Sequence, residues 1–306
     1  MRSSAGLLIR ENAPLARYTR FAVGGPARVL ADASTEAALI EALHEIREPY
    51  TVMGGGTNMV AADEGYAGVV LRYTNSSIEF TGDTVRVAAG AVLQDLVDAS
   101  IAHGLKGLET MTGIPGWVGG AVYGNAGAYG HSIHERVASV RYLEGECVHE
   151  IGNAVCEFAY RESVFKSRKD WIVLSAMLQL ESADAAELRA TADGILKIRN
   201  EKYPPTMRCA GSIFKNLLWA DLSEGVRAQV PAAVVREGKV PSAYFLEQAG
   251  AKCLVRGGVR VADYHANLIY NEGGGTAREV RELIADLKRR VLERFGLELE
   301  EEVQYV

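Results

Sequence analysis

The sequence predicts an α+β or α/β chain with mixed sheets. Strand-like and helix-like apolar patterns alternate along the chain, and a capping box begins a long amphipathic helix near its end. Glycine makes up 32 of 306 residues, which indicates many left-handed backbone positions or places where the backbone lies close to another group. The length suggests roughly two domains, at about 150 residues each.

The first half of the chain contains two predicted helices and several strands. Ser34 or Thr35 can cap the first helix, and Pro49 lies beyond its end. The apolar residues at helical spacing in this helix are Leu39, Ile40, Leu43 and Ile46. Strands are predicted at 50–53, 69–73 and 85–89. A second helix follows, ended by Gly104, with the apolar residues Leu93, Leu96, Val97 and Ile101 on one face.

The second half alternates in the same way. Residues 112–130 hold seven glycines in nineteen positions, which predicts no regular element there. Strands are expected at 136–143 and at 172–180, the latter with alternate apolar residues on one face. A helix over about 185–199 ends before Tyr203-Pro204-Pro205, where we expect the main domain boundary.

The end of the chain carries the clearest helix. Thr276 and Glu279 form a capping box, and Gly296 ends the helix. Its apolar face consists of Val280, Leu283, Leu287, Val291 and Phe295. A closing strand is predicted at 303–306.

Composition narrows the function classes. Hydrophobic residues make up 48% and charged residues 24%, as in a soluble globular protein. The net charge of −6 argues against a general nucleic-acid binder, which usually carries a basic excess. Four widely spaced cysteines predict no disulfide framework, and no apolar run approaches the ~20 residues that span a bilayer. We expect a cytoplasmic protein without a membrane segment.

The run Gly54-Gly55-Gly56-Thr57-Asn58 follows a predicted strand. Consecutive glycines let backbone N–H groups turn toward one point, which favours an anion. The run does not fit the dinucleotide fingerprint, because Met59 stands where its third glycine belongs, and no Gly-Lys-Ser/Thr of a P-loop follows. A tight turn without a ligand is the alternative.

The second glycine-rich segment, 112–130, has small residues throughout and no charge. This composition indicates a backbone that lies against a flat, largely apolar ligand such as a flavin or a nucleotide. The alternative is close packing of a helix on a sheet.

These two segments and three later motifs together resemble UDP-N-acetylenolpyruvoylglucosamine reductases, the MurB family. The later motifs are Tyr160-Arg161-Glu162-Ser163, Ala210-Gly211-Ser212-Ile213-Phe214-Lys215-Asn216 and Leu299-Glu300-Glu301-Glu302-Val303. The resemblance implies an α+β fold: a two-lobed FAD-binding domain of the vanillyl-alcohol-oxidase type plus a C-terminal α+β substrate domain. The lobes are expected at 1–75 and 76–200 and the substrate domain at 201–296, with 297–306 returning to the first lobe.

The resemblance also implies an activity. Members of the family reduce UDP-N-acetylglucosamine enolpyruvate to UDP-N-acetylmuramate for peptidoglycan synthesis, with noncovalent FAD as cofactor and NADPH as co-substrate. Hydride passes from the flavin N5 to the enolpyruvyl methylene, and negative charge develops beside the carboxylate. Such a reaction requires donors at that carboxylate, a proton donor at the adjacent carbon and a flavin held in register.

Three residues match the catalytic residues of the family. Arg161 matches the arginine that faces the carboxylate, Ser212 the proton donor and Glu302 the glutamate that assists the same carboxylate. Read from the residues alone, Arg161 could form a surface ion pair, Ser212 a turn and Glu302 part of a solvated acidic stretch. Glu301 and Leu217 stand where the family usually has proline.

The resemblance assigns binding residues as well. The residues expected to contact FAD are Met53, Gly54, Gly55, Gly56, Thr57, Asn58, Met59, Gly113, Ile114, Pro115, Gly119, Gly120, Asn125, Gly127 and Ala128. Those expected to contact the substrate are Tyr129, Lys202, Lys215, Asn216 and His265. Residues 197–216 contain five basic residues and one acidic residue, which suits a diphosphate, and Lys202 matches a lysine that meets the phosphate of the substrate or of NADPH.

Several further expectations follow. Only five residues separate Phe165 from Trp171, so the chain resembles the subclass that lacks a long tyrosine loop, and its substrate cleft should be open. His131 and His134 have no evident third ligand, so no metal is expected. We expect a monomer that binds neither nucleic acid nor membrane. The competing hypotheses are a flavin-dependent oxidase or dehydrogenase of another alcohol and a non-enzymatic nucleotide-sensing module.

Overall fold

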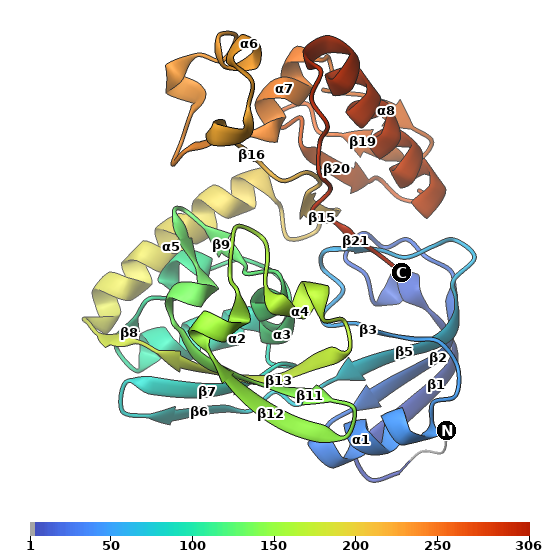
Figure 1. Ribbon diagram of the computed structural model, residues 1–306, viewed down its shortest axis with the longest axis vertical. Helices are drawn as coiled ribbons and strands as arrows, with labels where there is room; N and C mark the ends of the chain where they lie inside the picture. The colour runs from blue at the N-terminus through green and yellow to red at the C-terminus, as the bar shows by residue number, and fades with distance from the viewer. Residues whose placement is uncertain (1–3) are drawn as a thin grey trace. The chain divides into compact units, whose positions relative to one another are not determined.

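The computed structural model describes residues 4–306, so residues 1–3, with which the expected first lobe begins, lie outside the described residues. The chain forms two compact units (Figure 1). Unit 1 contains the described residues up to Ala13, Ala27–Gly56 and Ala67–Pro204, and unit 2 contains Pro14–Pro26, Thr57–Tyr66 and Pro205–Val306. The finer division at 75, 200 and 296 stays a prediction.

Unit 1 contains two main sheets. The first has the order β1-β2-β5-β3, formed by β1 (Leu7–Pro14), β2 (Pro26–Ala33), β5 (Tyr66–Tyr73) and β3 (Tyr50–Val52). The second is antiparallel in the order β12-β11-β13-β7-β6, formed by β12 (Cys147–Gly152), β11 (Val137–Glu144), β13 (Trp171–Gln179), β7 (Thr84–Ala88) and β6 (Ile78–Thr81). The predicted strands at 50–53, 69–73, 85–89, 136–143 and 172–180 are confirmed within one to three residues at either end.

Strand β13 differs from its prediction in one respect. Its sequence alternates, yet Ile172, Val173, Leu174, Ser175 and Ala176 are all buried. The strand is central in its sheet, α3 packs on it, and the burial of consecutive residues shows that side chains on both of its faces are covered. It therefore forms part of the core of unit 1 rather than a half-exposed surface.

The predicted helices of unit 1 are present as α1 (Glu36–Glu45), α2 (Leu93–Ala102) and α5 (Ala185–Lys202). Thr35 caps α1 through the backbone N–H of Ala38, and Asp184 caps α5. The short elements of this unit are β8 (Leu105–Lys106), β9 (Gly127–Ala128), β10 (His131–Ser132), β14 (Glu181–Ser182) and α4 (Val164–Ser167).

The prediction that 112–130 contains no regular element is wrong. Residues Val118–Tyr123 form the helix α3, which packs on β13 and β7. Val118, Ala121 and Val122 are buried at helical spacing, and a Cβ at Gly119 would lie only 2.8 Å from that of Ala89. The glycines therefore allow the helix to approach the sheet closely, which was the alternative reading of the segment.

Unit 2 is built around the sheet β15-β20-β19-β18 and the helix α8. The strands are β15 (Arg208–Ser212), β20 (Leu268–Asn271), β19 (Val259–Val261) and β18 (Val255–Arg256), and α8 spans Ala277–Phe295. The capping box of Thr276 and Glu279 is confirmed, as is Gly296 at the left-handed C-terminus. The other elements are β16 (Leu217–Leu218), β17 (Lys239–Val240), α6 (Glu224–Arg227) and α7 (Ser242–Gln248).

Distant parts of the chain complete unit 2. The final strand β21 (Gln304–Tyr305) pairs in parallel with β4 (Met59–Val60), and Phe21, Val23 and Val60 join its core. The Asp63 carboxylate accepts hydrogen bonds from the backbone N–H groups of Ala277 (2.7 Å) and Arg278 (2.9 Å) at the start of α8. Such a contact stabilises a helix N-terminus.

Two expectations from composition can be compared with the structure. Within residues 4–306, no helix is both long and apolar enough to cross a bilayer. All four cysteines are free: Cys156 and Cys209 are buried, while Cys147 and Cys253 are exposed. Burial raises the pKa of the Cys156 thiol to about 11, so it is neutral near pH 7.

Candidate functional site

The first glycine run leaves β3 at Met53. The Met53 side chain is buried in the core. Its backbone N–H donates to the Leu71 carbonyl (2.9 Å). Among residues 4–306, the N–H groups of Gly54, Gly55 and Gly56 donate to no other protein group. Gly56 has a φ of +63°, which turns the chain. The predicted run of available backbone donors is therefore present in unit 1.

The second glycine-rich segment is fixed to the turn before α2. The N–H of Val118 donates to the Ala91 carbonyl (2.9 Å) and that of Gly119 to the Ala89 carbonyl (2.8 Å). A Cβ at Gly55 would lie 3.1 Å from the Trp117 ring, so the two glycine-rich segments pack on each other. The Gly113 N–H donates to the Gln94 side chain (2.7 Å).

At two positions in these segments, Gly54 and Gly120, the fold itself does not require glycine. A Cβ at Gly54 would meet nothing closer than the Gly120 backbone nitrogen at 4.0 Å, and one at Gly120 would meet nothing within 4 Å. Neither has a positive φ. Glycine at both positions leaves open a space that a side chain would fill, beside the available N–H groups. We call this open space the cradle; available N–H donors beside it are what the phosphates of a nucleotide cofactor such as FAD require.

Two buried side-chain oxygens point to the same kind of ligand. Within residues 4–306, the Thr112 hydroxyl in unit 1 and the Asn58 Oδ1 in unit 2 form no hydrogen bond. A buried polar atom normally has a partner, which a polar ligand can supply. Thr112 was not among the predicted contacts, although it begins the quoted glycine-rich segment.

Asn125 and Gly127 have structural roles in unit 1. Asn125 is buried with a φ of +42°, and its amide donates to the Ala159 carbonyl (2.8 Å) and accepts from the His134 N–H (3.3 Å). A Cβ at Gly127 would lie 2.4 Å from the His131 carbonyl oxygen, so the β9–β10 hairpin requires glycine there. The Asn125 side chain therefore connects this hairpin to the segment before Arg161.

Arg161 lies at the tip of a tight turn. Ala159 and Glu162 exchange two backbone hydrogen bonds (3.1 Å each), and Arg161 between them has a φ of +60°, which is rare for a residue with a side chain. The Lys166 ammonium donates to the Arg161 carbonyl, and Arg161 Nη2 donates to the Gly127 carbonyl (3.1 Å). Such strain persists only where the surroundings fix it, and it is typical of functional positions.

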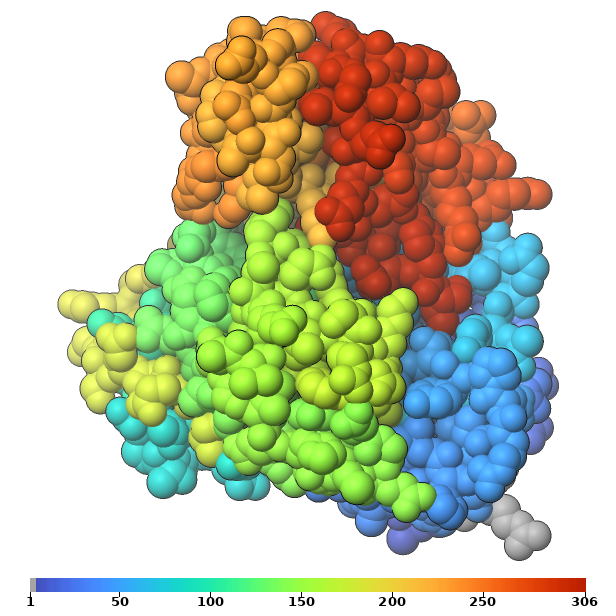
Figure 2. Space-filling view, in the orientation of Figure 1, coloured from blue at the N-terminus to red at the C-terminus, as the bar shows by residue number. Residues whose placement is uncertain are grey.

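The two predicted substrate contacts of unit 1 are accessible. Tyr129 is 47% exposed and has a φ of +54°. Lys202 is the exposed last residue of α5, with its Nζ 5.2 Å from the centroid of the Tyr203 ring. The green and lime part of the chain forms a continuous surface of unit 1 in Figure 2.

Ser212 ends β15 in unit 2, where it is opposite Leu268 of β20. Gly211 before it has a φ of +76°. The loop after Ser212 is held by Asn267, whose buried amide accepts from the Phe214 N–H (2.9 Å) and donates to the Phe214 carbonyl (2.9 Å) and to Ser242 Oγ (2.7 Å). Asn267 follows the predicted contact His265, and its support of this loop was not predicted; Ser242 is a supporting residue that no motif revealed.

Glu302 lies next to this loop. Its N–H donates to the Ile213 carbonyl (2.7 Å), and its carbonyl accepts from Asn58 Nδ2 (2.9 Å). The Gln304 N–H donates to the Asn58 carbonyl (2.9 Å). Unit 2 thus brings together two predicted residues, Asn58 and Glu302, and the loop that begins at the predicted Ser212, from three distant parts of the sequence.

The other predicted residues of unit 2 lie along the same loop or near it. The Lys215 side chain is mostly buried and pairs with Glu300, and Asn216 Oδ1 accepts from the Ser242 N–H (3.4 Å). His265 is half-buried, and its carbonyl accepts from the Leu268 N–H (3.1 Å).

The two histidines of the H-x-x-H spacing have other partners in unit 1. His131 Nδ1 lies 2.8 Å from the Glu135 carboxylate, and His134 Nδ1 lies 2.7 Å from the Ser132 hydroxyl. Among the described residues, 4–306, no group of histidine, cysteine and acidic side chains could hold a metal ion.

Two family models match the chain. An FAD binding domain matches residues 27–148, and the C-terminal domain of UDP-N-acetylenolpyruvoylglucosamine reductase matches residues 203–306. Thr112 and all of the predicted FAD contacts fall within the first match, and Ser212 and Glu302 fall within the second.

Individual proteins match along almost the whole chain. The UDP-N-acetylenolpyruvoylglucosamine reductase of Solibacter usitatus is 57% identical over 303 residues, which covers 98% of this chain and 97% of that protein. The enzyme of the same name from Clostridium perfringens is 31% identical over 307 residues, with coverage of 97% and 93%. The crystal structure of the Thermus caldophilus reductase matches with a TM-score of 0.78 and 28% identity, covering 97% of this chain and 99% of that one.

Proposed function

The chain belongs to the UDP-N-acetylenolpyruvoylglucosamine reductase family, and on that premise we propose that it reduces UDP-N-acetylglucosamine enolpyruvate to UDP-N-acetylmuramate with NADPH. It is an FAD-dependent oxidoreductase of peptidoglycan precursor synthesis. The observation that supports the proposal most directly is the short backbone contact between Glu302 and the loop that begins at Ser212. The reaction requires a proton donor and a carboxylate partner close together, and these two residues are the candidates.

FAD fits the cradle beside Gly54 and Gly120, with the N–H groups of Gly54 to Gly56 available for its phosphates. When bound, it supplies a carrier that accepts hydride from NADPH and passes hydride to the enolpyruvyl methylene. We propose that the protein holds it noncovalently. A yellow protein whose colour is released by heat or acid precipitation would agree with this, and a colour that stays on the chain would contradict it.

Arg161 is the proposed donor to the substrate carboxylate. Its planar guanidinium can form two parallel hydrogen bonds to a carboxylate, and these strengthen as negative charge develops on the substrate. The strained turn presents the side chain from a fixed backbone. Glu302 is the proposed partner at the same carboxylate, where its protonated form donates a hydrogen bond.

Ser212 is the proposed proton donor. After hydride arrives at the methylene, the carbon beside the carboxylate is a strong base, so the Ser212 hydroxyl needs correct placement more than an altered pKa. The hydrogen bonds of Asn267 to the backbone of the following loop supply that placement. The hydroxyl then regains a proton from solvent.

Lys166 should position Arg161 through the Arg161 carbonyl. We expect Lys166→Met to slow reduction of the substrate by about 10-fold, as expected when a reacting group is misplaced, with unchanged FAD content. Exposed Lys169 provides a matched control, Lys169→Met, which should behave as wild type. Rapid mixing of reduced enzyme with substrate measures the rate. Equal rates in the two variants would show that the turn does not depend on Lys166.

The substrate diphosphate is assigned to the basic residues of 197–216. Replacing Lys202 by alanine should weaken binding of the UDP-sugar by ~1.5–3 kcal/mol, the range for a hydrogen bond to a charged group. Lys169→Ala, an exposed lysine outside 197–216, is the control and should change the affinity much less. Titration calorimetry at low and high salt provides the measurement. If the affinity changed neither with salt concentration nor with Lys202→Ala, the diphosphate would bind elsewhere.

The reaction itself is tested by NADPH consumption under anaerobic conditions. We expect sustained oxidation only when the UDP-enolpyruvyl sugar is present. Oxidation that continues with another alcohol or carbonyl acceptor and not with the sugar would favour a different flavin enzyme. We further propose a cytoplasmic monomer, since NADPH and nucleotide sugars are cytoplasmic reactants, with neither nucleic acid nor membrane as a partner.

A further inference from the structure

The C-terminal segment 299–306 of unit 2 is bound on both edges. Toward the Ser212 loop, the Lys215 N–H donates to the Glu300 carbonyl (2.9 Å) and the Glu302 N–H donates to the Ile213 carbonyl (2.7 Å). Toward β4, the segment pairs through Gln304 and Tyr305. Glu301 lies between the first two bonds, opposite Phe214, and its own N–H takes no part in them.

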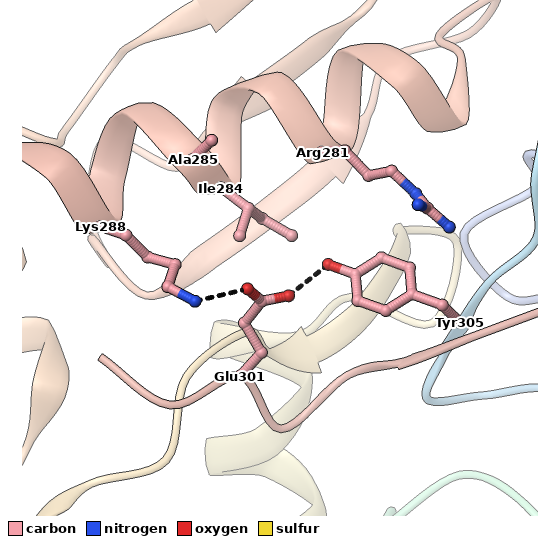
Figure 3. Close-up of a pocket in the computed structure, with 6 residues that line it drawn as sticks. All are labelled: Arg281, Ile284, Ala285, Lys288, Glu301 and Tyr305. Atoms are coloured by element: carbon pink, nitrogen blue, oxygen red, sulfur yellow. Dashed lines mark hydrogen bonds and ion pairs between the residues drawn. The ribbon is translucent and has the colours of Figure 1, made fainter. Parts of the chain in front are cut away.

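The Glu301 side chain is held against α8 (Figure 3). Lys288 Nζ lies 2.9 Å from Glu301 Oε1, and the Tyr305 hydroxyl donates to Glu301 Oε2. The Arg281 guanidinium lies 4.4 Å from the centroid of the Tyr305 ring. Figure 3 shows Lys288 and Arg281 projecting from the same helix, on either side of Ile284.

This arrangement joins two points of the C-terminal segment, Glu301 and Tyr305, to one helix. Burial, and then the negative charge and hydrogen bond of Glu301, raise the pKa of the Tyr305 hydroxyl above its usual range. The hydroxyl therefore stays protonated and continues to donate throughout the neutral range. Lys288 and Tyr305 thus each donate to one oxygen of the Glu301 carboxylate.

We infer that Glu301 is a positioning residue, which fixes the direction of the adjacent Glu302 side chain by anchoring the segment to α8; the inference rests on the proposed role of Glu302. In an extended chain, neighbouring side chains point to opposite faces. With Glu301 fixed toward α8, Glu302 must point to the other face. The Glu302 N–H donates to the Ile213 carbonyl, and the Glu302 carbonyl accepts from Asn58 Nδ2 and Gln304 Nε2. The clamp formed by the side chains of Glu301, Lys288 and Tyr305 adds resistance to rotation of the segment.

A proline at position 301 would restrain the segment by another route, because a proline ring restrains φ covalently. In this chain a charged side chain with two partners would supply the restraint instead. Because the Glu301 N–H is not used by the neighbouring segment, Glu301→Pro removes no hydrogen bond to that segment and serves as a rescue variant.

The first test is hydrogen exchange of the FAD-loaded enzyme without substrate. Glu301→Gln and Tyr305→Phe should both accelerate exchange in the peptide 299–306, where the Glu302 and Gln304 N–H groups are bonded. Glu298→Gln, which removes the same charge from an exposed residue just before this segment, should leave exchange as in wild type. Glu301→Pro should restore slow exchange. Exchange unaffected by Glu301→Gln would overturn the inference.

The second test separates positioning from general stability. Glu301→Gln should slow reoxidation of reduced enzyme by the UDP-enolpyruvyl sugar by about 10-fold, as for a misplaced catalytic group, and leave reduction by NADPH unchanged. In a Glu302→Gln background it should cause no further loss, because its effect acts through that carboxyl. A second loss of equal size in that background would contradict the inference.

The two tests also distinguish this inference from the proposed function. If Glu302→Gln slows reoxidation but Glu301→Gln does not, the proposed function stands and the positioning role is wrong. If Glu302→Gln itself has no effect, the proposed role of Glu302 fails and the inference fails with it. Should Glu301→Gln prove too unstable to purify, Lys288→Met removes one partner alone and must show the same pattern of rates.

Discussion

Ser212→Ala is expected to slow reduction of the enolpyruvyl substrate by at least about 10²-fold, the low end for loss of a positioned general acid, while leaving the oxidation of NADPH unchanged. Hydride transfer from NADPH requires no proton from the protein. The substrate step leaves a carbanion that must be protonated, and Ser212 is the proposed donor. The loss should therefore be confined to one half of the reaction.

Rapid mixing under anaerobic conditions measures each half separately from the visible absorbance of oxidised flavin. Ser212→Cys is the informative companion, because a thiol at the same place can still donate a proton and should recover part of the rate. The Asn267 and Ser242 contacts of the following loop do not involve the Ser212 side chain, so Ser212→Ala should keep the loop in place. If the alanine variant slowed both halves equally, the role assigned to this serine would be wrong.

Valine at Gly54 or Gly120 is expected to remove FAD from a protein that still folds. The structure leaves open space at both positions, so the new side chain costs the apoprotein little and occupies the proposed ligand cradle instead. We expect the Kd for FAD to rise by at least about 100-fold, which is ~2.8 kcal/mol at 1.4 kcal/mol for each tenfold. The flavin content after purification and the Kd from titration of the apoprotein provide the measurement.

Two other glycines supply the controls. Gly194 is also an exposed helical glycine with nothing within 4 Å of a Cβ, so Gly194→Val should retain FAD. Gly119 packs on Ala89, so Gly119→Val should lower the melting temperature as well as the flavin content. Gly55 packs on Trp117, so Gly55→Val should likewise lower both the melting temperature and the flavin content. Full FAD occupancy in both Gly54→Val and Gly120→Val would show that the cofactor lies elsewhere.

Elements with strong local signals were predictable from the sequence. The capping box at Thr276, the periodic apolar face of α8 and the left-handed Gly296 all act within a few residues, and the structure confirms them. The helix α1 after Thr35 and three strands of the five-stranded sheet, β7, β11 and β13, follow for the same reason, whereas β6 and β12 were not predicted. The α+β fold class is likewise confirmed.

Features that depend on distant residues were not predictable in this way. The helix α3 forms in a glycine-rich segment because tertiary packing against Ala89 outweighs its low helix propensity. Asp63 contacts the start of α8 from more than 200 residues earlier in the chain. No local pattern indicates either contact.

The candidate site shows the same division. Motif order identified Arg161, Ser212 and Glu302 as candidates, and their roles stay predictions. The positive φ of Arg161, the buried amide of Asn267 and the clamp on Glu301 are visible only in the fold. These features act through backbone conformation or long-range contacts, which residue types alone do not specify.

The central claim is that the enolpyruvyl group is the hydride acceptor. It is tested most directly by reducing the wild-type enzyme with one equivalent of NADPH without oxygen and then mixing it with the UDP-enolpyruvyl sugar or, separately, with UDP-N-acetylglucosamine. We predict that the colour of oxidised enzyme returns only with the first, together with a product heavier than the substrate by one hydride and one proton. Colour that returns equally with both sugars, or with neither, would contradict the claim.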